Sequence, residues 1–127
     1  MPSAAQTFQQ ANDAPEIYYV VKGTLAFDPA MMPEGGSNDA EGAQVPATLT
    51  GYALSAEGFT SPFSAPVTLD VGCAGPWCGG IGQGAHIAFI RQDAGGWTLD
   101  VGPCPGSAFE ASAEVEAEVI ACMQGGC

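Results

Sequence analysis

Basic residues are almost absent from this chain of 127 residues: Lys22 and Arg91 stand against 14 acidic residues, and the formal net charge is −12. Nucleic-acid binding requires several Lys or Arg side chains that neutralise phosphates. An anionic membrane surface attracts basic segments and repels acidic ones. The composition therefore argues against nucleic acid and against an anionic membrane surface as partners.

Long apolar runs are missing as well. No stretch approaches the roughly 18 apolar residues of a membrane-spanning helix. Residues 1–14 have neither the basic region nor the apolar run of a signal peptide, so an exported protein with this sequence would be a mature form whose targeting segment has been removed. Cysteine pairs of the form C-x2-C are absent and His86 is the single histidine, so we expect no bound metal and no other cofactor.

Five cysteines lie in the second half of the chain, at positions 73, 78, 104, 122 and 127. In a small, strongly acidic chain they predict an exported protein held together by disulfides. Gly125-Gly126 would let the tail fold back, which favours a Cys122–Cys127 pair. Cys104 follows a predicted hairpin that returns the chain toward both Cys73 and Cys78, and either is a possible partner. The odd number leaves at least one thiol free or paired between chains.

The hydrophobic pattern predicts a mainly β protein. Period-two alternation and β-branched residues mark five strands, at 16–27, 48–54, 67–71, 85–92 and 97–101. The residues at 93–96 form a hairpin turn. Because the strands are joined as meanders rather than by crossover helices, we expect a small five-stranded antiparallel barrel or sandwich.

The remaining segments complete a single domain at 16–127. Residues 1–15 are polar and rich in Ala, and we expect a flexible N-terminal arm. Residues 28–46 hold Pro, Gly and acids without periodicity and predict a long acidic surface loop. Ser107 and Glu110 have the spacing of a capping box, and the apolar residues that follow predict a C-terminal helix at about 108–124.

Few residues carry an obvious chemistry. Cys73, Cys78 and His86 would be the parts of a thiol-based redox protein or small enzyme, but no cationic neighbour is present to lower a thiol pKa, and a disulfide-anchored loop is the better interpretation. The acidic loop offers Glu34, Asp39 and Glu41 as oxygen ligands for Ca²⁺. Their spacing matches no calcium loop, so a solvated acidic loop is favoured.

Aromatic residues supply the candidate contacts with a partner. In a subunit of a larger assembly, Tyr18 and Tyr19 of the first strand and Phe59 and Phe63 of the next connector would be the interface anchors.

The segment from Val67 to Gly106 reads VTLDVGCAGPWCGG, then an HIAFI strand, then GWTLDVGPCPG. It resembles the bacterial branch of the netrin-like proteins related to tissue inhibitors of metalloproteinases. The resemblance rests on Cys78-Gly79, Gly84 and Cys104-Pro105-Gly106, and implies a five-stranded barrel of the oligonucleotide/oligosaccharide-binding (OB) type followed by a helix. It also favours Cys78 over Cys73 as the partner of Cys104, with Cys73 as the free thiol.

The resemblance does not extend to the inhibitory mechanism, because the N-terminal Cys-x-Cys of those inhibitors has no counterpart before Cys73. We therefore expect a non-catalytic, exported binding or accessory module, periplasmic or secreted by a bacterium, whose partner is another extracytoplasmic protein. The alternatives are the redox protein and the assembly subunit described above.

Overall fold

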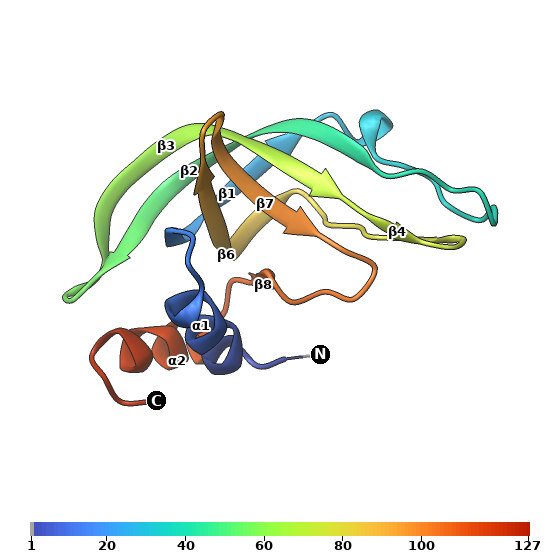
Figure 1. Cartoon of the computed structure of the whole chain (residues 1–127). Coiled ribbons are helices and arrows are strands. Elements are labelled where there is room, and N and C mark those ends of the chain that lie inside the picture. The colour runs from blue at the N-terminus through green and yellow to red at the C-terminus, as the bar shows by residue number, and fades with distance from the viewer. Residues whose placement is uncertain (1) are drawn as a thin grey trace.

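The computed structural model describes residues 2–127 and consists mainly of β-strands (Figure 1). Neither α-helix in this part of the chain has the length and apolar character that crossing a bilayer requires. In chain order the elements are α1 (Ala4–Asp13), β1 (Tyr18–Phe27), the 3₁₀ helix η1 (Pro29–Met31), β2 (Ala43–Ser55), β3 (Gly58–Val71), β4 (Cys73–Ala74), β5 (Trp77–Cys78), β6 (Gly84–Asp93), β7 (Gly96–Val101), β8 (Ala108–Glu110) and α2 (Ala113–Met123).

The strand pairings of the main sheet return to the strand where they began. They pass from β1 through β2, β3, β7 and β6, and β6 pairs again with β1. The short strand β8 adds to β6 at 86–88. The five predicted strands are therefore present as β1, β2, β3, β6 and β7, and the mainly β character is confirmed.

The expectation of a wholly antiparallel sheet is wrong, because β3 and β7 are parallel from the Val67–Trp97 pair to the Val71–Val101 pair. The directions follow from the order of pairing. Each of the pairs β1–β2, β2–β3, β1–β6 and β6–β7 is antiparallel. Both β3 and β7 therefore point the same way as β1, and they are parallel where they meet.

Two glycines let β1 and β2 approach closely. Gly23 and Gly51 lie opposite one another in the register. A Cβ on Gly23 would lie 2.6 Å from the carbonyl oxygen of Thr50, and a Cβ on Gly51 would collide with the carbonyl of Lys22. Glycine is therefore required at both positions for the backbones of β1 and β2 to approach this closely.

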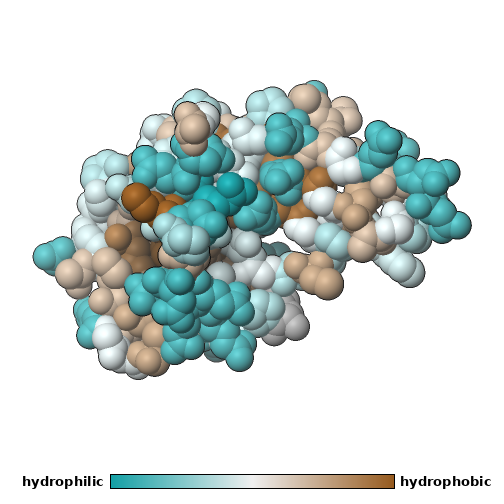
Figure 2. Space-filling model, in the orientation of Figure 1, coloured by the Kyte–Doolittle hydropathy of each residue, from teal (hydrophilic) through white to brown (hydrophobic). Residues whose placement is uncertain are grey.

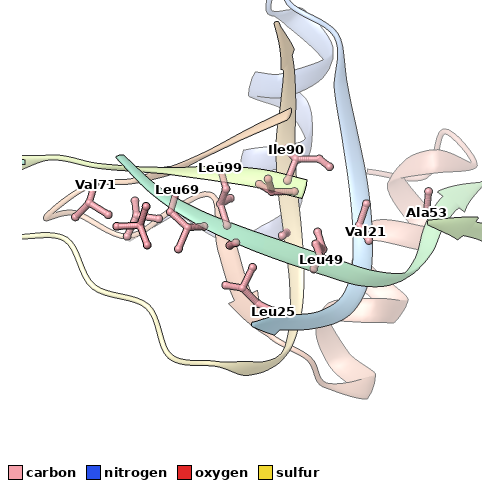
Figure 3. Packing of buried hydrophobic residues seen from close by; sticks show 13 residues of the cluster. Val21, Leu25, Leu49, Ala53, Leu69, Val71, Ile90 and Leu99 are labelled. Atoms are coloured by element: carbon pink, nitrogen blue, oxygen red, sulfur yellow. The ribbon is translucent and has the colours of Figure 1, made fainter. Parts of the chain in front are cut away.

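The larger core lies on the inner faces of the five main strands (Figure 3). Along β2 its members alternate with exposed residues, as expected for a strand with one buried face. The fully buried side chains of this core include Val21, Leu25, Val45, Leu49, Leu69, Ile90 and Leu99.

A second core forms between the outer face of the sheet and the two helices. Ile87 and Phe89 of β6 are buried here against Val119 of α2 and Ala4 of α1. The intervening residues of β6 belong to the larger core, so β6 is buried on both faces over His86–Ile90. This explains why HIAFI is a continuous apolar run rather than an alternating one.

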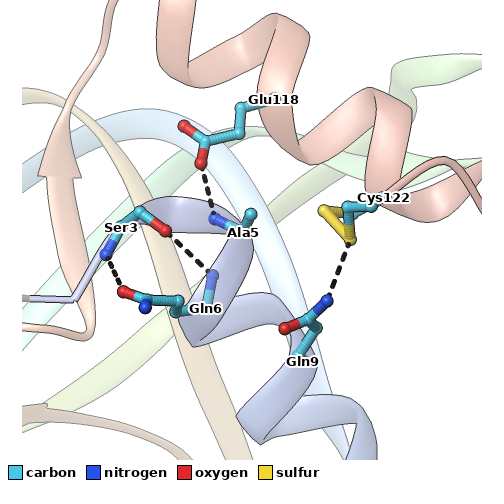
Figure 4. Close-up of a disulfide and its surroundings, with 7 residues drawn as sticks. Ser3, Ala5, Gln6, Gln9, Glu118 and Cys122 are labelled. Atoms are coloured by element: carbon cyan, nitrogen blue, oxygen red, sulfur yellow. Dashed lines mark hydrogen bonds between the residues drawn. A yellow bond between two sulfur atoms is a disulfide. The ribbon is translucent and has the colours of Figure 1, made fainter.

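Residues 4–13 form the helix α1, and the expectation of a flexible arm is wrong. Ser3 and Gln6 form a capping box at its start. The Ala5 N–H then donates to Glu118 at 2.9 Å, and the Gln9 side-chain amide donates to the Cys127 sulfur at 3.9 Å (Figure 4). The Thr7 hydroxyl donates to the Gly106 carbonyl at 2.8 Å, so polar contacts also hold the helix to the rest of the chain.

The C-terminal helix begins later than the predicted 108. Ser112, not Ser107, is the N-cap, and its side chain accepts a hydrogen bond from the Val115 N–H. Residues 108–110 are instead the strand β8, because the edge of β6 at 86–88 accepts them as a partner.

The predicted loop at 28–46 is shorter than expected, because η1 and the first residues of β2 occupy both of its ends. Pro46, which the sequence predicts in the loop, lies in β2. It is tolerated in β2 because β1 ends at the Phe27–Ala47 pair, and no strand of residues 2–127 lies on that side of Pro46.

Candidate functional site: a disulfide-closed hairpin and its surroundings

The strands β4 and β5 form a small hairpin that projects from one end of the sheet (Figure 1). Cys73 and Cys78 lie opposite one another in its register and are joined by a disulfide. Gly75, with φ at +58°, and Pro76 form the turn. Trp77 follows the turn and is 71 % exposed, the most exposed large hydrophobic side chain of the described residues. A large aromatic side chain is thus displayed on a covalently braced support.

The acidic loop between η1 and β2 packs against this hairpin. The Gly36 N–H donates to the Pro76 carbonyl at 2.8 Å. Gly35 has a φ of +71°, and a Cβ there would lie 2.8 Å from the same carbonyl oxygen. The loop is therefore held beside the hairpin by a backbone contact that only glycine allows.

Three exposed carboxylates, Glu34, Asp39 and Glu41, lie on this loop. Figure 2 shows hydrophilic side chains gathered at the end of the molecule that carries it. The calcium alternative on these residues is not supported, because no group of three or more potential ligands occurs in residues 2–127. The loop instead uses a local turn, in which the Asp39 N–H donates to the Ser37 hydroxyl.

Both basic residues are engaged away from the acidic loop. The Lys22 ammonium contacts Glu116 at 2.7 Å. The Arg91 guanidinium contacts Asp100 at 3.0 Å and Asp93 at 3.6 Å. The hydrogen bond to Asp100 raises the pKa of Arg91, so this cation stays charged. No Lys or Arg side chain is therefore left to neutralise the acids beside the hairpin.

The cysteine assignment is corrected in part. Cys122 pairs with Cys127 as predicted. Cys73 pairs with Cys78, however, and Cys104 is the free, exposed thiol, so the Cys78–Cys104 pair and the free Cys73 are wrong. The physical reason is the Gly-Pro turn, which folds β4 onto β5 and brings the two Cα atoms within 3.9 Å. That turn signal was present in the sequence.

His86 is not joined to the cysteines. Its Nε2 lies 2.8 Å from the Gly82 carbonyl oxygen, and since a carbonyl only accepts, Nε2 carries the proton. The side chain is buried at the edge of a cavity of about 510 Å³ that Asp100 and Glu110 also line. The disulfide and the histidine thus have separate partners, and the structure does not assemble Cys73, Cys78 and His86 into one site.

The four aromatic residues predicted to contact a partner have mainly internal roles. Tyr18 and Phe59 pack against the second core. Phe63 packs edge-on against Trp97, with 5.7 Å between the ring centroids. Tyr19 also contacts Trp97, with 4.6 Å between the ring centroids. Tyr19 alone of the four is exposed, at 44 %.

A groove lies beside Tyr18 and Tyr19, between α1, β1 and the end of the β2–β3 ribbon. Its volume is about 390 Å³, and Phe8, Leu54 and Met123 form much of its wall. Neither this groove nor the exposed position of Trp77 was predicted from the sequence. The Cys-x4-Cys spacing around a Gly-Pro turn is the signal that would have located Trp77.

Comparison of the chain with family models, with curated proteins and with solved structures finds no match.

Proposed function

We propose that this protein is a non-catalytic binding module of the extracytoplasmic space, periplasmic or secreted, and that Trp77 anchors its partner protein. The exposed indole on a disulfide-closed hairpin is the observation that carries the proposal. Tryptophan is enriched among the residues that dominate binding energy at interfaces. A braced hairpin loses little conformational entropy on binding, so more of the contact energy appears as affinity.

The surroundings of Trp77 indicate a partner with a basic surface. Glu34, Asp39 and Glu41 lie on the loop that packs against the hairpin, and the two basic residues of the chain are paired elsewhere. Complementary charge at the rim of an interface raises the association rate and selects among partners. The partner would therefore offer an apolar pocket for the indole with Lys or Arg side chains around it.

The fold proposal that accompanies this function is an OB-type barrel of the netrin-like kind. Its support is the circuit of pairings β1–β2–β3–β7–β6–β1. The Cys78-Gly79 step of the resemblance also has a physical role, because a Cβ on Gly79 would collide with the Val101 carbonyl at the end of β7. Two disulfides are consistent with an oxidising compartment.

The test uses the protein as immobilised bait for a native envelope extract, in wild-type form and as the Trp77→Ala and Tyr52→Ala variants. Tyr52 is the matched control because it is 52 % exposed and lies on β2, outside the hairpin. We expect wild type and Tyr52→Ala to capture the same protein, and Trp77→Ala to lose about 2 kcal/mol or more of its affinity for that protein.

The captured protein is then purified and mixed with the bait, and a stoichiometric complex on gel filtration is required. Equal affinity of the Trp77→Ala variant and wild type for that partner contradicts the proposal. So does turnover of a small molecule by the bait alone.

A further inference from the structure

A cavity lies between the end of β7, the strand β8 and the loop that joins β5 to β6. It is lined by residues 80–82, 100–102 and 105–110, together with His86 of β6 and Val115 of α2. Figure 1 shows β8 between the sheet and the two helices, where these segments meet. The volume of about 510 Å³ falls within the range of about 300–1,000 Å³ that small-molecule sites occupy.

His86 is a buried polar side chain of this cavity, with 8 % of its surface exposed. Its Nε2 donates to the Gly82 carbonyl, which leaves the Nδ1 of the neutral ring as an acceptor. The Gly82 contact is the one side-chain hydrogen bond of His86 within residues 2–127. In the same part of the chain, no fully buried side-chain nitrogen or oxygen lacks a partner. Nδ1 is therefore not fully buried, and it opens to the cavity that His86 lines.

Glu110 places a carboxylate beside this acceptor. It lies directly opposite His86 in the antiparallel β6–β8 register. Side chains of directly opposite residues extend from the same face of a sheet, with Cβ atoms about 4.5–5.5 Å apart. Glu110 belongs to no ion pair among the described residues, since Lys22 and Arg91 contact other acids. Its negative charge is therefore not neutralised by a basic side chain.

The polar groups of the cavity accept hydrogen bonds rather than donate them. The lining residues with a polar side chain are His86, Asp100, Ser107 and Glu110. Only the Ser107 hydroxyl among them has a hydrogen to donate into the cavity, because carboxylates and the Nδ1 of a neutral imidazole only accept. No Lys or Arg of residues 2–127 lines it. The occupant is therefore a hydrogen-bond donor, and the two carboxylates favour a positively charged one.

A metal ion does not fit this arrangement. No group of three or more His, Cys, Asp or Glu side chains that could hold one occurs in the described part of the chain. Acceptors too far apart for a single ion suit an ammonium group, whose three N–H donors point in different directions. Ile81, Val101 and Val115 also line the cavity. Apolar walls with a few polar groups favour an organic ligand that has an apolar body.

We propose that this cavity binds a small primary amine. The ammonium group donates to the Nδ1 of His86 and to the Glu110 carboxylate, and the body of the amine contacts the apolar walls. Asp100 adds negative charge, although Arg91 already contacts it at 3.0 Å. Trp77 does not line this cavity, so the site goes beyond the proposed partner contact.

The state of the His86 ring in the free protein tests the premise. We expect nitrogen NMR of the imidazole at neutral pH to find one proton, on Nε2, and none on Nδ1. A ring protonated at both nitrogens would make Nδ1 a donor that Glu110 itself satisfies. That result would overturn the proposal, because the cavity would no longer need a donor from a ligand.

The binding test uses phenethylamine, whose ammonium group carries a short apolar body, and three matched controls. Phenethyl alcohol lacks the charge, hydrocinnamate reverses it, and phenethyltrimethylammonium keeps it without an N–H. We expect phenethylamine to bind at least about 10-fold more tightly than each control, a difference of about 1.4 kcal/mol, and to shift the Nδ1 resonance of His86. No binding of phenethylamine at millimolar concentration, or equal binding of the trimethylated form, would overturn the proposal.

Two charge-neutralising variants separate the site from the general acidity of the chain. Glu110→Gln and Glu114→Gln change the net charge equally, but Glu114 is exposed on α2 and does not line the cavity. We expect Glu110→Gln to bind phenethylamine about 10-fold more weakly than wild type, a loss of about 1.4 kcal/mol, and Glu114→Gln to bind it as wild type does. Equal affinities of the two variants would overturn the proposal.

The Trp77→Ala variant distinguishes this site from the proposed function. We expect it to bind phenethylamine as wild type does, so failure of partner capture and failure of amine binding are independent results. An exposed indole also attracts cations. Loss of phenethylamine binding in Trp77→Ala would assign the binding to the indole and overturn the cavity proposal.

Discussion

The backbone N–H of Ala5 in the first turn of α1 donates a hydrogen bond to the carboxylate of Glu118 on α2, at 2.9 Å and across 113 positions of the sequence. An N–H in the first turn of a helix has no acceptor within that helix. The carboxylate supplies one and also places negative charge at the positive end of the helix dipole. This contact joins the two ends of the chain over the second core.

Replacing Glu118 should therefore release α1. We expect Glu118→Ala to lower the free energy of unfolding by about 1 kcal/mol, the loss of a charge-assisted hydrogen bond and a favourable dipole interaction. Glu118→Gln keeps an acceptor without the charge and should lose less than half of that amount. Urea denaturation measures both. A Glu118→Ala variant as stable as wild type would show that α1 is held by its apolar contacts alone.

The close approach of β1 and β2 at Gly23 and Gly51 gives a second prediction. Gly51→Ala should destabilise the protein by about 3 kcal/mol, because the new methyl group collides with backbone atoms of Lys22 and Gly23. Gly72→Ala is the control, since a Cβ there meets nothing within 4 Å. Thermal unfolding of the two variants should separate them clearly. Similar melting temperatures of the Gly51→Ala and Gly72→Ala variants would contradict the close approach of the two strands.

The disulfides give a third prediction. Peptide mapping without reduction should recover the Cys73–Cys78 and Cys122–Cys127 peptides, and an alkylating reagent should modify Cys104 without denaturant because that thiol is exposed. A Cys78–Cys104 peptide from freshly purified protein would contradict the structure.

The stability cost of the hairpin disulfide follows from its short loop. Closing about six residues restricts the unfolded chain by about 2 kcal/mol in the chain-entropy model. The Cys73→Ala/Cys78→Ala double variant should lose about that amount in urea denaturation, whereas Cys104→Ala should stay within about 0.5 kcal/mol of wild type. An equal loss in both variants would show that the free thiol also supports the fold.

The carboxylate of Asp93 gives a prediction of pH dependence. The Thr98 hydroxyl donates to it at 2.6 Å and the Gly95 N–H at 3.0 Å. The hydrogen bond from Thr98 is the main cause that lowers the pKa of Asp93 below its usual range. A lowered pKa stabilises the folded state above the ordinary Asp pKa. That stabilisation is lost as the pH falls through the lower pKa of the folded protein.

Carbon-detected NMR titration should therefore find the pKa of Asp93 below that of an unstructured Asp. Thr98→Val removes the donor and should raise this pKa, whereas Thr98→Ser keeps the hydroxyl and should leave it low. An unchanged pKa in Thr98→Val would assign the effect to the backbone donors of the 93–96 turn instead.

The sequence predicts the strands most reliably where alternation is clean. Val67, Leu69 and Val71 alternate with polar residues and form the end of β3 as expected. The same strand begins nine residues earlier than its predicted start, at Gly58. Pro62 and Pro66 interrupt the pattern there, and the sequence cannot show that this part of β3 lies on an open edge. The β3–β7 register begins only at Val67, so Pro62 and Pro66 precede it and have no strand partner from β7. The N–H that proline lacks therefore leaves no sheet hydrogen bond unmade on that side.

The N-terminal helix illustrates the opposite case. Its capping box, Ser3 and Gln6, is visible in the sequence, but a ten-residue helix is marginal in isolation. Its stability comes from tertiary contacts, namely the apolar packing of the second core and the hydrogen bonds to Glu118 and Gly106, whose acceptors lie about 100 residues or more away along the chain. Local propensity therefore could not distinguish this helix from a flexible arm.

The sequence alone determines that the protein is acidic, mainly β and cross-linked, because charge, period-two alternation and cysteine number are local properties of the chain. Tertiary structure decides how these parts meet. The partner of Cys78, the parallel contact of β3 with β7 and the exposure of Trp77 all depend on which segments of the chain become neighbours. The free energy that selects those neighbours is shared among many long-range contacts, and no single stretch of sequence displays it.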